Sequence, residues 1–268
     1  MTATDTLFAG SIPGLYDLYM VPLLFAPYAR LVAERAAGFA PASILETAAG
    51  TGVVTGELHR AIPAAEIIAT DLNPPMLEQA ARRVSAANVH FRHADALDLP
   101  FEDRRFDLVV CQFGIMFFPD KVAGNAEARR VLAADGHYLL VIWDRVEFNL
   151  ATHVAGKAIA AMFPDDQGAF YERIPFRYHD KAEIERDLVA AGFGSVEIET
   201  VERRSRAASA RDVAIGLVQG TPMRSEIEQR GADALARATD VATKALEQFE
   251  GPDGFDAPMS AHLVTATR

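Results

Sequence analysis

Apolar positions between about residues 42 and 143 follow two alternating periods, which predicts strands separated by helices. Short runs of apolar and β-branched residues predict strands at 43–48, 66–70, 89–91, 106–111 and 138–143. Between these runs apolar residues recur every three or four positions, which predicts helices from Gly52 to about Arg60, over 74–84 and over 121–132. Strands joined by helices of about ten to fifteen residues indicate a parallel sheet with helices on both faces.

The remainder of the chain has a less regular pattern. Helices are predicted at 150–162 and 180–191, a strand at 195–201, a mostly helical stretch at 209–250 and a last strand at 261–267. Ala134-Asp135-Gly136 is the expected stop of the helix that ends near Leu132, because glycine often follows a helix C-terminus. The predicted fold class is therefore α/β, with a doubly wound, mostly parallel sheet.

Composition and charge narrow the setting of the protein. The chain has 268 residues and a formal net charge of −11, so its surface repels phosphate backbones and no nucleic-acid partner is expected. No window reaches the roughly 18–20 apolar residues that a membrane span requires, and the first residues lack a signal-peptide pattern. The single cysteine, Cys111, fits a reducing compartment. We therefore expect a cytoplasmic protein with no membrane partner.

The segment Glu46-Thr47-Ala48-Ala49-Gly50-Thr51-Gly52 lies between a predicted strand and a predicted helix. Small residues there let the backbone approach a ligand, and the following helix presents free N–H groups at its positive end. Asp71 follows about nineteen residues after Gly52, at the end of the next strand, where an acid can accept both hydroxyls of a ribose. These features together predict an adenine nucleoside cofactor.

Two cofactors fit this pattern to different degrees. A nicotinamide dinucleotide usually requires G-x-G-x-x-G, and here the third glycine, Gly56, comes one position late. Glu46 would also repel a pyrophosphate, whereas it suits a sulfonium and an ammonium group. With Asp71 and Asp95 it places three carboxylates along one sheet edge, which favours the cationic S-adenosylmethionine over a dianionic cofactor.

Several motifs in the right order resemble class I S-adenosylmethionine-dependent methyltransferases, and most closely the ubiquinone-biosynthesis-type branch that acts on small molecules. The motifs are Glu46 to Gly52, Asp71, Asp95-Ala96, Leu99-Pro100-Phe101-Glu102-Asp103, Phe106-Asp107, Gln112-Phe113-Gly114 and Glu127-Ala128-Arg129-Arg130-Val131-Leu132 before Gly136. The likeness is strong over roughly 40–145 and covers the rest only in element order. One departure is Ala48, where the fullest form of the motif has glycine, and this bears on cofactor affinity rather than identity.

The resemblance implies a seven-stranded Rossmann-like sheet with an antiparallel last strand. Because ligands bind beyond the carboxyl ends of parallel strands, we also expect a helical lid at that edge. It would comprise an N-terminal helical cap over residues 1–40 and insertions at 144–179 and 205–255 in a methyltransferase domain over 41–268. The implied reaction is in-line transfer of a methyl group to an O, N, C or S atom of a small organic molecule, with S-adenosylhomocysteine as product. A homodimer interface is the alternative use of the 205–255 excursion.

The same resemblance implies roles for individual residues. The methionine part of the cofactor would be faced by Glu46 and by the loop residues Ala48, Ala49, Gly50 and Gly52, and the ribose by Asp71. The adenine would pack against Leu72 and Met76, and its polar edge would meet Asp95 and Ala96. The sulfonium would lie beside Gln112 and Phe113, and Tyr16 would be a further cofactor contact. Tyr19, Met116 and Phe117 would contact the methyl acceptor. For Asp95 the alternative is an ordinary acid in a surface turn.

No catalytic residue is assigned from the sequence. His153, His179 and Asp144 are candidates for a general base by position, and Tyr16 and Tyr19 by their place before the core. The sulfonium is an activated donor, however, so orientation of the acceptor can supply most of the acceleration. No acidic cluster follows both the fourth and fifth strands, so no metal is expected. The rival functions are a non-catalytic protein that binds S-adenosylmethionine or its product and, less favoured, a nicotinamide-dependent oxidoreductase. Asn73-Pro74-Pro75 resembles a motif of nucleic-acid amino-methylating enzymes, but its place indicates a helix start.

Overall fold

The computed structural model describes residues 12–163 and 170–268. Residues 1–11 and 164–169, which belong to the expected cap and the first expected lid insertion, lie outside the described residues. Within the described part, no helix is long and apolar enough to span a membrane.

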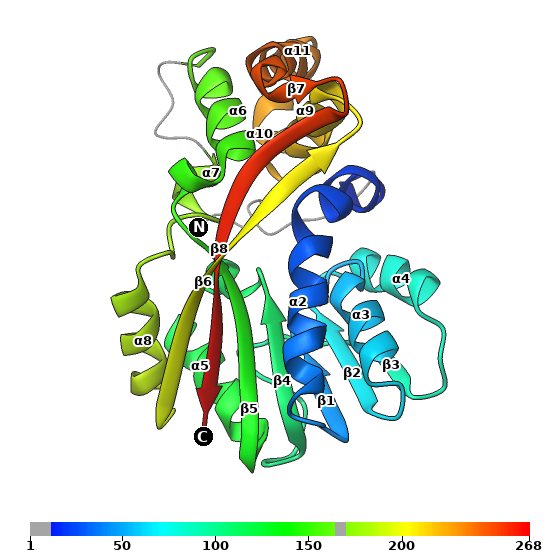
Figure 1. The fold of residues 1–268 in the computed structure, drawn as a ribbon, viewed down its shortest axis with the longest axis vertical. Coiled ribbons are helices and arrows are strands. Elements are labelled where there is room, and N and C mark those ends of the chain that lie inside the picture. Colours follow the sequence, from blue (N-terminus) through cyan, green and yellow to red (C-terminus); the bar gives the residue numbers. More distant parts are fainter. Residues whose placement is uncertain (1–11, 164–169) are drawn as a thin grey trace. The chain divides into compact units, whose positions relative to one another are not determined.

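The described strands form one mixed sheet with the order β3-β2-β1-β4-β5-β8-β6 (Figure 1). They are β1 (Ser43–Glu46), β2 (Glu66–Asp71), β3 (Val89–His93), β4 (Phe106–Gln112), β5 (Leu132–Trp143), β6 (Ser195–Ala207) and β8 (Gly254–Thr267). The pairs β1–β2, β1–β4, β2–β3 and β4–β5 are parallel, whereas β8 is antiparallel to β5. This confirms the expected seven-stranded sheet. The two-residue β7 (Glu250–Gly251), which the sequence pattern did not predict, pairs with β8.

Helices cover both faces of the first five strands, which explains why β4 is buried along nearly its whole length. Figure 1 shows α2 (Ala26–Ala37) and α3 (Val53–Ala61) in front of these strands and α5 (Lys121–Val131) behind them. Helix α4 (Pro74–Arg83) begins at its two prolines, which confirms that Asn73-Pro74-Pro75 is a helix start. Helix α8 (Lys181–Ala190) begins where the Asp180 carboxylate accepts from two backbone N–H groups.

The boundary between α5 and β5 differs from the sequence-based expectation. Helix α5 ends at Val131, and the next residue already begins β5, so Ala134-Asp135-Gly136 lies inside a strand rather than in a helix stop. A Cβ at Gly136 would lie 2.8 Å from the Leu132 side chain and 3.1 Å from the Asp107 carbonyl oxygen. Glycine is therefore required here by close packing beside a register shift in the β4–β5 ladder.

The chain divides into two compact units. The sheet unit comprises residues 28–143, 178–201 and 261–268 and contains β1 to β5, the first half of β6 and the second half of β8. Its core consists of the strand residues between the flanking helices, including Ile44, Leu45, Leu108, Val109 and Leu140, all of them fully buried.

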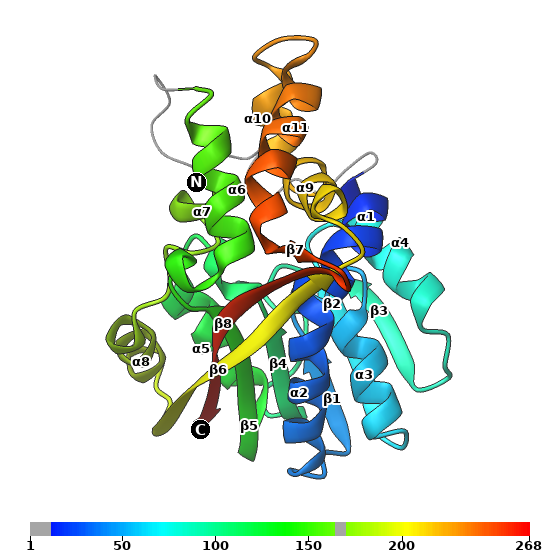
Figure 2. The ribbon, with the colours of Figure 1, turned by 45° about the horizontal axis from the view of Figure 1, so that its top comes forward.

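Among the described residues, the helical unit comprises 12–27, 144–163, 170–177 and 202–260. Its elements are α1 (Ile12–Leu15), the π-helix η1 (Tyr16–Phe25), the 3-10 turns η3 (Val146–Phe148) and η4 (Glu247–Phe249), α6 (Leu150–Ala160), α7 (Phe170–Arg173), α9 (Ala210–Gln219), α10 (Met223–Glu228) and α11 (Ala234–Leu246), with β7 and the remaining halves of β6 and β8. Helix α11 packs on α9 and α6 (Figure 2). Its apolar residues Ala238 and Ala242 are fully buried, so this face of α11 is covered within the unit.

Candidate functional site

The turn between β1 and α3 has an unusual backbone. Ala48, Gly50 and Gly52 all have positive φ values, of 53°, 56° and 78°. Such a series turns the chain sharply from the strand into the helix, whose N-cap is Gly52. A Cβ at Gly50 would have nothing within 4 Å, so the space beside this backbone is open to a ligand.

Asp71 is joined directly to this turn. Its Oδ2 accepts from the Gly50 N–H at 2.8 Å, and its Oδ1 accepts from the Asn73 N–H at 2.8 Å. Burial raises the pKa of Asp71, and the hydrogen bonds from Asn73 and Gly50 offset part of that effect. The structure therefore brings together two of the predicted cofactor residues from neighbouring strand ends.

Glu46 ends β1 and is 2 % exposed. Its Oε2 accepts from the Thr55 hydroxyl at 2.5 Å. Burial raises the pKa of Glu46 to about 8, against the lowering effect of the Thr55 hydrogen bond and with a further increase from the charge of Asp71. A buried carboxylate of this kind gains most from a nearby cation, so the site fits the ammonium group of an amino-acid cofactor.

The predicted adenine contacts differ in their surroundings. Asp95 is exposed and lies in a short turn, where its Oδ1 accepts from the Leu97 N–H at 2.9 Å. Ala96 in the same turn is half-buried. Leu72 is 51 % exposed, which is rare for a leucine in this structure, whereas Met76 is buried on α4. The turn fits the alternative of a surface acid as well as the adenine role, so the role of Asp95 stays a prediction.

The segment after β4 meets the glycine turn at close range. Phe113 has a φ of 54°, and its ring stacks on Trp143 with a centroid distance of 3.7 Å and contacts Tyr28 edge-on at 5.4 Å. A Cβ at the next residue, Gly114, would lie 2.5 Å from the Ala48 Cβ. The predicted sulfonium contacts at the end of β4 are therefore adjacent to the turn that follows β1.

The predicted acceptor contacts fall in two places. Met116 and Phe117 form the 3-10 turn η2 (Ile115–Phe117) after β4, where Met116 is buried and Phe117 half-buried. Tyr16 and Tyr19 belong to the helical unit. The Tyr16 ring stacks on Phe25 with a centroid distance of 5.0 Å, and Tyr19 packs beside α9. The roles of both tyrosines stay predictions.

Among the candidates for a general base, Asp144 has a structural role in a buried hydrogen-bond network. The Asp144 Oδ2 accepts from the Ser260 hydroxyl at 2.9 Å, and the Asn149 amide joins the same buried network. His153 and His179 are both half-buried. Among the described residues, no group of three or more His, Cys, Asp or Glu side chains could hold a metal ion.

Sequence reasoning missed Thr55 and Gly114. Thr55 is a fully buried hydroxyl on the first turn of α3, and a polar residue inside an otherwise apolar helix face was the available signal. Gly114 was quoted only as part of a motif, because its close approach to Ala48 depends on the fold. Cys111, the single cysteine, is fully buried in β4.

A family model described as a methyltransferase domain matches residues 44–136. The demethylmenaquinone methyltransferase of Deinococcus radiodurans is 36% identical over 144 residues, which cover 52% of this chain and 59% of that protein. Its counterpart from Thermus thermophilus is 38% identical over 131 residues, covering 47% and 60%. The chain thus spans about 60% of the length of these two relatives.

The solved structures agree on the fold. The phosphoethanolamine N-methyltransferase 2 of Haemonchus contortus, solved with phosphomonomethylethanolamine and S-adenosylhomocysteine, superposes with a TM-score of 0.60 at 17% identity. The superposition covers all of this chain and 61% of that one, and at this identity it shows the fold alone. The family match and the relatives named for demethylmenaquinone bear out the resemblance inferred from the motifs: residues 44–136 carry a methyltransferase domain of the class I, S-adenosylmethionine-dependent type.

Proposed function

We propose that this protein transfers the methyl group of S-adenosylmethionine to an O, N, C or S atom of a small organic molecule. The observation that carries the proposal is the hydrogen bond from the Gly50 N–H to Asp71, beside the buried Glu46. It joins an acid at the end of β2 to an open glycine turn at the end of β1, which is the edge where parallel sheets bind ligands.

The residues of this edge fit the parts of the cofactor. Asp71 accepts hydrogen bonds from the Gly50 N–H, the Asn73 N–H and the Asn73 side-chain amide, and a carboxylate has about four lone-pair sites, so it retains capacity for a ribose hydroxyl. Glu46 would hold the ammonium group, and the open space at Gly50 would admit the methionine backbone. Bound there, the cofactor supplies an activated methyl group, and the protein's task is to orient the acceptor and exclude water.

The helical unit is proposed as the lid that shapes the acceptor site. The β5–β8 ladder ends with the pair Trp143 and Ala261, and the chain leaves the sheet unit directly after Trp143 and returns at Ala261. Both crossings therefore occur at the carboxyl end of β5, the edge where Asp71 and Glu46 also end their strands. The buried face of α11 supports this role over a dimer interface, because α9 and α6 cover it.

The acceptor is proposed only as a class. The relatives from Deinococcus and Thermus are named for demethylmenaquinone, and the alignments extend over about half of this chain. A demethylated quinone is therefore the first acceptor to test, alongside other small nucleophiles. The acidic net charge of −11 argues against nucleic acid.

Calorimetry tests the cofactor part of this proposal. We expect S-adenosylmethionine and S-adenosylhomocysteine to bind and NAD not to bind. Asp71→Ala should weaken binding by roughly 1–3 kcal/mol, the usual loss with a charge-assisted hydrogen bond. Binding of NAD with no heat from either adenosyl ligand would refute the proposal.

Activity is tested with a methyl-labelled cofactor and a metabolite extract to which a demethylated quinone is added. Transfer of label to a small molecule is the expected result. Tight binding of the cofactor without transfer to any acceptor would instead support the non-catalytic binding protein.

A further inference from the structure

The loop between β3 and β4 is held by a pair of charged residues on α5. This loop begins with the turn of Asp95, where a single bridge links Asp95 to Asp98. Farther along, the loop has few contacts of its own, among them the hydrogen bond from the Phe101 N–H to the Leu99 carbonyl at 2.8 Å. Its fixed position therefore depends on groups outside the loop.

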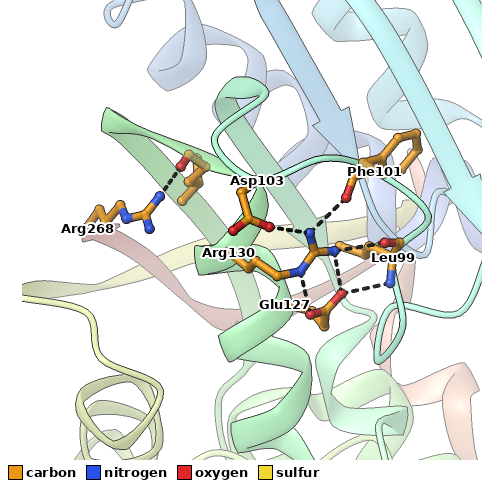
Figure 3. A network of polar contacts seen from close by, with 7 residues as sticks. Leu99, Phe101, Asp103, Glu127, Arg130 and Arg268 are labelled. Carbon is orange, nitrogen blue, oxygen red and sulfur yellow. Dashed lines mark hydrogen bonds and ion pairs between the residues drawn. The ribbon is translucent and has the colours of Figure 1, made fainter.

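Most of the hydrogen bonds that hold the loop from outside are donated by the guanidinium of Arg130 (Figure 3). Its Nε donates to Glu127 Oε1, its Nη1 to the Phe101 carbonyl and to Asp103 Oδ1, and its Nη2 to the Leu99 carbonyl and to Glu127 Oε2, each at 2.8 Å. A guanidinium has five N–H donors, so every donor of Arg130 is engaged. Three of the five bonds go to the loop.

Glu127 completes the arrangement. Its Oε2 also accepts from the Leu99 N–H at 2.9 Å, so Leu99 is held through both its N–H and its carbonyl. The hydrogen bond from Arg130 lowers the pKa of Glu127. Leu99 is 3 % exposed, so packing of its side chain in the core also restrains this residue.

Leu99 is four positions from Asp95, and the intervening residues form the Asp95 turn. The Asp95 Oδ1 is used inside that turn by the Leu97 N–H, whereas Oδ2 has no hydrogen bond to a described residue. The turn is held at both ends: the Ala94 N–H donates to the Asp71 carbonyl at 3.2 Å on one side, and Leu99 is held by Arg130 and Glu127 on the other. The direction of Oδ2 and of the Ala96 N–H therefore depends in part on the anchor at Leu99. A rigid anchor matters because selectivity between two bases requires donors and acceptors at fixed positions.

We propose that Arg130 and Glu127 are positioning residues that fix the Asp95 turn and thereby set the protein's selectivity for adenine. This rests on the proposed function, since it assumes that the adenine of the cofactor meets this turn. Neither residue touches the cofactor in this account. They act through Leu99, and the fork geometry of the guanidinium is what lysine cannot reproduce.

The test compares the parent protein with Arg130→Lys, Asp95→Ala and Arg60→Lys. The probes are S-adenosylhomocysteine and S-inosylhomocysteine, in which a carbonyl replaces the amino group that Asp95 would accept from. Arg60→Lys is the matched control, because Arg60 also pairs with a glutamate three positions earlier on its helix, while its side chain is largely exposed. Binding is measured by calorimetry, and exchange of the Leu99 amide by hydrogen exchange.

The parent and Arg60→Lys should prefer the adenine ligand to the same degree. Arg130→Lys should reduce that preference by roughly three- to tenfold, toward the value for Asp95→Ala, and should speed exchange of the Leu99 amide while leaving β4 amides protected. Lower thermal stability with an unchanged preference would show a purely structural role and overturn the inference. It would also be overturned if Asp95→Ala kept the full preference of the parent.

Failure of the proposed function has a different signature. In that case the parent itself binds neither adenosyl ligand, whereas failure of this inference leaves a parent that binds and discriminates. Glu127→Gln gives a second variant, since it removes the charge but retains an oxygen for the Leu99 N–H. It should exchange the Leu99 amide at a rate between those of the parent and Arg130→Lys.

Discussion

Thr55 donates a hydrogen bond to Glu46 over 2.5 Å, and both side chains are almost completely buried. The glutamate ends β1 and the threonine lies on the first turn of α3, so the bond crosses the turn that carries the glycines. The carboxylate thus has a neutral donor but a strongly raised pKa, which makes it responsive to both pH and a cationic ligand.

The first prediction concerns the free energy of unfolding. The pKa of Glu46 is near 4.5 in the unfolded chain and about 8 in the folded protein, so the folded state binds more protons between these values. The contribution of Glu46 is therefore most favourable below pH 4.5 and is lost as pH rises to about 8. Glu46→Gln should be more stable than the parent at pH 8.5 and nearly equal at pH 5, as measured by urea unfolding.

Cofactor affinity should show the opposite dependence. Binding of an ammonium requires the charged carboxylate, so affinity in the parent should increase from pH 6 to pH 8. Glu46→Gln should bind weakly and without this pH dependence. Glu185→Gln, at an exposed position on α8, serves as the control and should match the parent in both measurements. A stability gain in both variants alike would refute the assignment to Glu46.

The second prediction concerns Gly114. Its φ of −103° and ψ of −44° suit any residue, so only space forbids a side chain there. A Cβ would lie 2.5 Å from the Ala48 Cβ and 2.9 Å from the Cys111 sulfur. Gly114→Ala should lower the free energy of unfolding by about 1–3 kcal/mol and weaken cofactor binding, because it pushes the glycine turn away. Gly251→Ala, where a Cβ meets nothing within 4 Å, should change neither, by thermal unfolding and calorimetry.

Much of the sheet unit could be predicted from sequence because its signals are local. Continuous apolar runs mark strands buried on both faces, and glycine or acid residues mark the strand ends. The extensions of β6 and β8 beyond the predicted strands could not be predicted in this way. There Arg204 on β6 pairs with Asp256 on β8 at 2.6 Å, and such a cross-strand ion pair leaves no periodic apolar pattern.

The site could be predicted in outline for the same reason. Glu46, Gly50 and Asp71 belong to a motif with fixed spacing, so their positions at strand ends followed once the strands were known. The roles of Thr55 and Gly114 could not be predicted from the sequence, because each role depends on a partner far away in sequence or on another element. The three hydrogen bonds from Arg130 to the loop could not be predicted either, since two of their acceptors are backbone carbonyls.

The third prediction uses the single tryptophan of the chain. Trp143 stacks on Phe113, which the motif places beside the sulfonium. Cofactor binding should therefore change the intrinsic fluorescence of Trp143 in a saturable way, with a midpoint equal to the calorimetric dissociation constant. Phe113→Leu should bind cofactor with a much smaller fluorescence change, because the stacked ring is gone. An unchanged signal in that variant would show that the cofactor does not act through Phe113.

The fourth prediction concerns the helical unit. A Cβ at Gly254 would lie 2.6 Å from the Ala207 carbonyl oxygen, so the ends of the 209–250 stretch are close enough for a short linker. Replacing 209–250 with a Gly/Ser linker should preserve cofactor binding and abolish methyl transfer, as measured by calorimetry and label transfer. Turnover at the parent rate in the shortened protein would rule out the lid. A shortened protein that remains active but loses self-association would instead identify a dimer interface.

The contact between Ala48 and Gly114 leaves room for one methyl group between the two turns. Ala48 occupies that room at a φ of 53°, a conformation that glycine adopts more easily. The two positions therefore form an exchangeable pair, in which Ala48→Gly should tolerate and partly reverse the damage of Gly114→Ala. Across homologous sequences, alanine at one of these positions should be accompanied by glycine at the other. The alanine at position 48, which departs from the fullest motif, is thus permitted by Gly114, sixty-six positions later in the chain.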